Sequence, residues 1–147
     1  MLPLLVLFGL AAGAMLPFQA GINAQLAVHL DSPLRAALVS FLVGTLVLVA
    51  VWLLFARGWP SAERMGAAPW WVWIGGALGA FYVTGSIVVA PRLGAVTLIA
   101  VILAGQALAS LVVDHYGMVG FDAHPATAGR VAGLLLIALG VLFVRLF

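Results

Sequence analysis

Three side-chain amides within an apolar stretch are the first residues of this chain that could bind a ligand. Gln19, Asn23 and Gln25 lie among alanine, glycine, isoleucine and leucine residues. At about 100° per residue, Gln19 and Asn23 share one face of a helix. An amide donates and accepts hydrogen bonds without carrying charge. This face therefore predicts either contact with a polar solute or hydrogen bonds that only join neighbouring helices, and both interpretations stay open.

Pro17 lies in the same stretch, and its ring removes a hydrogen bond from any helix that contains it. Without an N–H, Pro17 cannot donate to the carbonyl of Gly13. Inside a bilayer, a freed carbonyl is tolerated where it meets protein or a water-filled cavity. We expect Pro17 to act as a hinge or to shape this helix.

Further polar residues lie within predominantly apolar stretches, among them Tyr82, Ser86 and Gln106. Tyr82 and Gln106 fall near the centres of their stretches, so we predict that both, with Ser86, Gln19 and Asn23, line a substrate-binding site. For Tyr82, packing or hydrogen bonding between helices is the more frequent role of such a residue, and both interpretations stay open.

Asp114 and His115 form the one adjacent pair that could take up and release protons, because histidine changes charge near neutral pH. The alternative is a solvated helix end. Three scattered histidines and no cysteine predict no metal site and no disulfide. Neither a Ser-His-Asp order nor a glycine-rich phosphate loop occurs, so we expect neither an enzyme nor a cofactor.

The composition requires a membrane. Hydrophobic residues make up 66% of the 147 residues and charged residues 7%, against about 25% charged in soluble domains. Because the six basic residues are dispersed arginines, no nucleic-acid partner is expected. A spanning helix needs about 20 apolar residues. The sequence predicts an all-α polytopic domain over 1–147, with helices at about 2–28, 34–56, 70–90, 93–113 and 127–147. We expect the first of these to be a retained transmembrane helix and not a cleaved signal peptide.

The arginines favour neither orientation in the membrane, because five spans leave three arginines on each side. One side holds Arg57, Arg64 and Arg130, and the other holds Arg35, Arg92 and Arg145. Either a weak bias is hidden by the positions of the loops, or the chain inserts both ways. Oppositely inserted copies could pair as an antiparallel homodimer with the ten-helix, inverted-repeat plan of many transporters.

An ordered set of motifs over nearly the whole chain resembles the YdcZ-like five-helix proteins of the drug/metabolite transporter superfamily. The motifs are Gln19-x-x-x-Asn23; Pro33-x-x-Ala36 with Ser40-Phe41-x-x-Gly44; Trp71-x-Trp73-x-Gly75-Gly76-x-Leu78-Gly79-Ala80-x-Tyr82-Val83; Pro91-Arg92-Leu93-Gly94; Gly105-Gln106-x-x-x-Ser110 with Asp114-His115-x-Gly117; and Arg130-x-x-Gly133. The resemblance implies five transmembrane helices and half of a ten-helix transporter. It brings no established binding residues.

Together these observations predict a multi-pass protein of the bacterial inner membrane. We expect a dual-topology antiparallel homodimer that moves a small polar or zwitterionic solute by alternating access through a midplane cavity. Proton-driven small multidrug exporters resemble this plan but use a glutamate in the first helix, where this chain has amides. The alternatives are a non-transporting assembly factor, whose amides only join helices, and one subunit of a heteromeric transporter.

Overall fold

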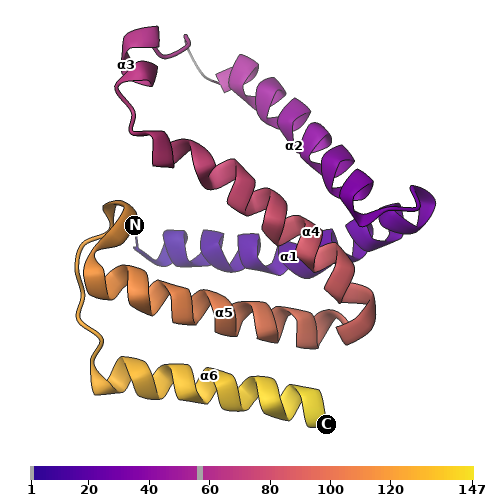
Figure 1. Cartoon of the computed structure of the whole chain (residues 1–147), viewed down its shortest axis with the longest axis vertical. Helices are drawn as coiled ribbons and strands as arrows, with labels where there is room; N and C mark the ends of the chain where they lie inside the picture. Colours follow the sequence, from indigo (N-terminus) through magenta and orange to yellow (C-terminus); the bar gives the residue numbers. More distant parts are fainter. Residues whose placement is uncertain (1, 56–57) are drawn as a thin grey trace. The chain divides into compact units, whose positions relative to one another are not determined.

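The computed structural model describes residues 2–55 and 58–147, and these ranges contain helices and no strand (Figure 1). Five stretches of the described residues are long and apolar enough to cross a membrane. They are α1 (Leu2–His29), α2 (Pro33–Phe55), η1 with α4 (Trp70–Ile74 and Gly75–Leu93), α5 (Ala95–Tyr116) and α6 (Ala128–Leu146). The short helices α3 (Ala62–Gly66) and η2 (Met118–Gly120) lie in the connections. The predicted all-α, five-span architecture is confirmed.

The helix ends lie within a few residues of the predicted ones, and local chemistry explains the differences. α4 runs through Pro91 to Leu93 rather than ending near residue 90, because a proline in the last turn removes only one bond. Gly94 then interrupts the helix with φ 76°, a conformation that glycine adopts without penalty. The predicted end of the second helix at Ala56, and Arg57 with it, lie outside the described residues.

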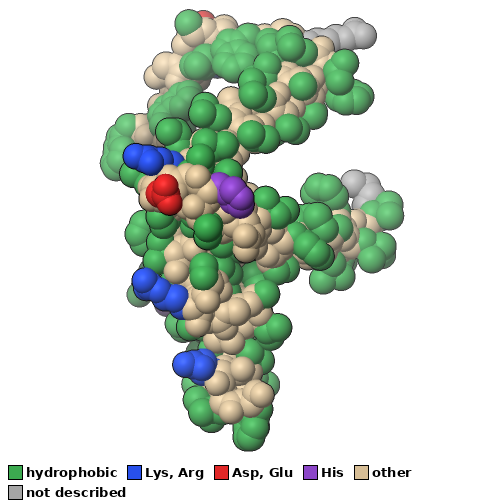
Figure 2. Space-filling view, turned by 90° about the vertical axis from the view of Figure 1, so that its right-hand side faces the viewer, with side chains coloured by type: hydrophobic (Ala, Val, Ile, Leu, Met, Phe, Trp, Pro, Cys, Tyr) green, Lys and Arg blue, Asp and Glu red, His purple; other side chains and the backbone are tan. Residues whose placement is uncertain are grey.

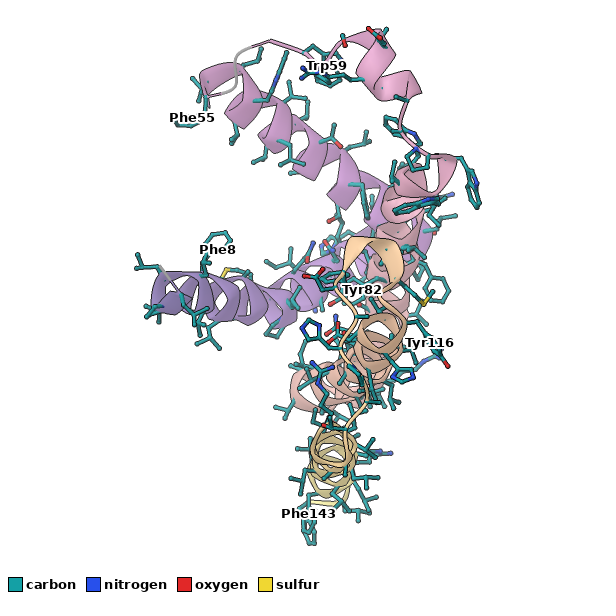
Figure 3. The ribbon with its side chains drawn as sticks, turned by 90° about the vertical axis from the view of Figure 1, so that its left-hand side faces the viewer. Phe8, Phe55, Trp59, Tyr82, Tyr116 and Phe143 are labelled. Carbon is teal, nitrogen blue, oxygen red and sulfur yellow. The ribbon has the colours of Figure 1, made fainter. Side chains whose placement is uncertain are left out.

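Large apolar side chains point away from the helices. Phe8, Phe55 and Phe143 project outward from α1, α2 and α6 (Figure 3) and are 76%, 81% and 61% exposed. Hydrophobic side chains also dominate the face shown in Figure 2. Such a surface suits lipid, because a bilayer is as apolar as the side chains themselves.

The chain groups into two compact units, residues 18–92 and residues 1–17 with 93–147. In the first, Ala36 and Ala37 of α2 and Val83 and Ile87 of α4 form a small buried cluster, against which Leu26, Ala27 and Tyr82 pack. Small side chains let helices approach closely where no hydrophobic effect drives them together.

In the other unit, α5 and α6 run side by side in opposite directions (Figure 1). Thr127 caps α6 by accepting a hydrogen bond from the backbone N–H of Arg130. An ion pair joins the two helices, since Arg130 lies 3.2 Å from the Asp114 carboxylate. The connection is therefore held at the beginning of α6 and at the end of α5.

Candidate functional site

A cleft of about 210 Å³ opens beside Gln19 within the unit of residues 18–92. Residues of α1, α2 and α4 line it, and all of them belong to predicted membrane spans. They are Gln19, Ser40, Phe41, Gly44, Thr45, Leu48 and Val83. The wall therefore combines one amide and two hydroxyls with apolar side chains, and none of these residues ionises.

α2 supplies most of this wall. Its five lining residues, from Ser40 to Leu48, recur at alternating steps of one and three positions, so they share one helix face. Phe41 is positioned by α4, because a Cβ added at Gly79 would lie 3.5 Å from the ring atom Cζ. The glycine thus leaves the room into which the Phe41 ring packs.

The polar groups of the cleft have no partner within the part of the chain that the structure describes. None of its side-chain hydrogen bonds involves Gln19, Ser40 or Thr45. Ser86 behaves differently, since its Oγ donates to the Tyr82 carbonyl one turn earlier at 2.8 Å. Serine and threonine in helices often form this bond to their own backbone. The cleft therefore presents free donors and acceptors.

The other predicted binding residues lie in different surroundings. Asn23 and Ser86 are buried, at 5% and 7% exposed, and Tyr82 is half-buried against the alanine-rich cluster of α2 and α4. Gln19, Asn23, Tyr82 and Ser86 belong to one compact unit, whereas Gln106 lies exposed on α5 in the other. That these five residues meet in a single site stays a prediction.

Asp114 and His115 each have a partner at the connection between α5 and α6. Asp114 pairs with Arg130, and the Nδ1 atom of His115 accepts the backbone N–H of Ala126 at 3.1 Å. Both contacts fasten the connection to the end of α5. A role in proton coupling for this pair stays a prediction.

Two other clefts contain charged side chains, in contrast to the one beside Gln19. Asp114 and Arg130 line a cleft of about 330 Å³ between α5 and α6, and Asp31 and Arg92 line one of about 310 Å³ near the end of α1. Within residues 2–55 and 58–147, no three histidine or acidic residues gather where they could hold a metal ion.

Sequence reasoning did not assign Ser40 and Thr45 to the site. The available signal was their helical spacing around Gly44 in a span that is otherwise apolar. That signal alone does not say whether the shared face meets lipid, another helix or a cleft. The neighbouring α1 and α4 decide it.

Comparison with known proteins places this architecture in a family. The family described as "Putative inner membrane exporter, YdcZ" matches residues 4–143. The chain is 32% identical over 134 residues to the inner membrane protein YdcZ of Escherichia coli strain K12, covering 90% of this chain and 89% of the relative. No solved structure matches. With its five apolar helices, this is a multi-pass protein of the inner membrane, and the chain belongs to the YdcZ family.

Proposed function

We propose that this protein exports a small polar solute by alternating access, working as an antiparallel homodimer of dual topology. The family description as an inner-membrane exporter supports the class of activity. The observation that carries the proposal is the cleft beside Gln19, where an amide and two hydroxyls without described partners face one space inside membrane spans. Polar groups within a span are costly, so they are typical of a transport pathway.

In this mechanism, the amides of Gln19, Asn23 and Gln106 hydrogen-bond the solute in a midplane cavity of the dimer. Tyr82 and Ser86, which do not line the cleft beside Gln19, complete the wall of that cavity. Pro17 acts as the hinge of α1. The missing hydrogen bond lets the helix bend there at low cost.

The equal distribution of arginines supports the antiparallel homodimer, because neither orientation is favoured on insertion. Two oppositely oriented copies have ten helices related by an axis in the membrane plane. In transporters of that plan the solute site lies near the midplane at the repeat interface. Each copy would then contribute one set of amides.

Flux into proteoliposomes that contain only this protein tests the proposal. We would screen labelled sugars, polyols and amino acids, and then compare the wild type with Asn23→Ala and Gln106→Ala. Both variants should abolish transport while the dimer stays intact on cross-linking. Gln25→Ala is the matched control, since it removes an amide near the end of the same helix. Normal transport by both site variants would disprove the site assignment.

The burial of Asn23 favours a second candidate function. An amide that is 5% exposed is also suited to joining helices, as expected of a membrane assembly factor that moves no solute. In that case the purified protein gives no flux with any solute, and Asn23→Ala weakens the assembly itself. Flux that appears only when a second, oppositely oriented chain is added would instead identify one subunit of a heteromeric transporter.

A further inference from the structure

We propose that the cleft beside Gln19 binds small neutral solutes rich in hydroxyl or amide groups, and that Ser40 and Thr45 of α2 determine its specificity. This inference rests on the transport function proposed above and names the class of solute for it. It also excludes ions and zwitterions from this site.

The charge of the cleft is the first argument. None of its lining residues ionises, whereas the two charged clefts contain Asp31 with Arg92 or Asp114 with Arg130. An ion that leaves water for a site within the bilayer loses its hydration, and no opposite charge replaces it here. A neutral polar solute loses less hydration free energy, and hydrogen bonds to the cleft can replace the hydrogen bonds that it made to water.

The hydrogen-bonding capacity is the second argument. The Gln19 amide has two N–H donors and one carbonyl acceptor, and each hydroxyl of Ser40 and Thr45 can donate one bond and accept others. Thr45 lies close to the middle of α2, far from either membrane surface. A solute that carries donors and acceptors side by side, as polyols, sugars and carboxamides do, can satisfy all three side chains together.

The size of the cleft and its apolar wall narrow the class further. Its volume of about 210 Å³ lies below the ~300–1,000 Å³ typical of sites for drug-sized ligands. The ring of Phe41 and the side chains of Leu48 and Val83 offer contact to the C–H face of such a solute. A small polyol suits a cleft of this volume and composition.

Cysteine reactivity tests the cleft without knowledge of the natural solute, because the chain has no cysteine of its own. We would place Thr45→Cys in the full-length protein in membrane vesicles. Leu46→Cys is the control. It lies about 1.5 Å from position 45 along the helix axis and is exposed, as Thr45 is, but it lines no part of this cleft. The probes are hydroxyethyl, trimethylammonium-ethyl and sulfonatoethyl methanethiosulfonates, which are neutral, cationic and anionic.

Each rate is first divided by the rate at which the same reagent modifies a free thiol in solution. The neutral reagent should then modify Thr45→Cys at least about tenfold faster than it modifies Leu46→Cys. It should also modify Thr45→Cys at least about tenfold faster than either ionic reagent does. Adding Gln19→Leu should slow the reaction at position 45, whereas adding Gln25→Leu should not. Equal rates at positions 45 and 46 would overturn the site. A cationic or anionic rate equal to the neutral one would overturn the solute class.

Solute flux is a separate readout. A reactive cleft in a protein that transports nothing would contradict the proposed function and leave the site standing. Flux by the wild type with an unreactive position 45 would contradict this site and leave the transport function standing.

Discussion

At the scale of single residues, the candidate site depends on polar groups that do not titrate. Gln19, Ser40 and Thr45 line the cleft, while the carboxylate of Asp114 is engaged by Arg130 at the end of a span. Amides and hydroxyls keep their hydrogen-bonding pattern at any physiological pH. A site of this kind discriminates by the positions of donors and acceptors, and any proton coupling would have to involve residues elsewhere in the chain.

Gly117 is the residue whose replacement we expect to disturb the backbone most directly. It ends α5 with φ 60°, and an added Cβ would lie 3.2 Å from the Ala123 side chain. Left-handed backbone costs about 1–2 kcal/mol for other residues, so Gly117→Ala should lower the free energy of unfolding by at least that amount. Unfolding in mixed detergent micelles measures it.

Gly120→Ala is the matched control for this experiment. Gly120 also has positive φ, at 90°, but an added Cβ would meet nothing within 4 Å. It should show the backbone penalty without the steric one, so its destabilisation should be the smaller of the two. Equal losses for both variants would show that Ala123 does not restrict position 117.

At the scale of helices, α2 packs against α4 where the ring of Phe41 lies next to Gly79. Gly79→Ala would place a Cβ at ordinary contact distance from Phe41, so we expect a change in stability of less than about 0.5 kcal/mol. Gly79→Leu would push the ring away and should cost about 1–3 kcal/mol, as overpacking does. Thermal unfolding in detergent compares the two variants.

Gly76→Leu controls for the cost of a large side chain on the same helix, because nothing lies within 4 Å of a Cβ at that position. It should leave the melting temperature unchanged. If Gly76→Leu and Gly79→Leu melt alike, the contact between Phe41 and Gly79 does not fit α2 against α4.

At the scale of the whole molecule, the orientation of the chain decides whether it can pair with itself in antiparallel fashion. We predict dual topology. A cysteine placed after Phe147, and another at Ser61 in the connection before α4, should each be about half accessible to an impermeant thiol reagent from outside the cell, because the arginines impose no bias.

Labelling before and after the cells are opened supplies the total for each site. If instead each position is labelled wholly from inside or wholly from outside, the antiparallel homodimer is excluded. The search would then turn to an oppositely oriented partner chain or to a parallel assembly. That the five spans act as one domain, as half of an inverted repeat, is a prediction that this measurement would strengthen or remove.

The sequence by itself determined the membrane location, the five spans and the family. A spanning helix satisfies all its backbone hydrogen bonds within one segment, so the length and composition of each segment suffice to identify it. The residues that begin and end these helices also act through hydrogen bonds and backbone angles within their own segment. Gly94 ends the run that contains Pro91, and Thr127 begins α6, without reference to any other part of the chain.

Only the tertiary structure decided which side chains meet. It brought Ser40 and Thr45 to the cleft of Gln19, set Phe41 against Gly79, and paired Asp114 with Arg130. α1 and α2 are apolar on nearly every face, so their hydrophobic periodicity does not indicate which face turns toward another helix. In a bilayer that choice follows from close packing and from partners for polar groups, and both depend on neighbouring helices rather than on the segment itself.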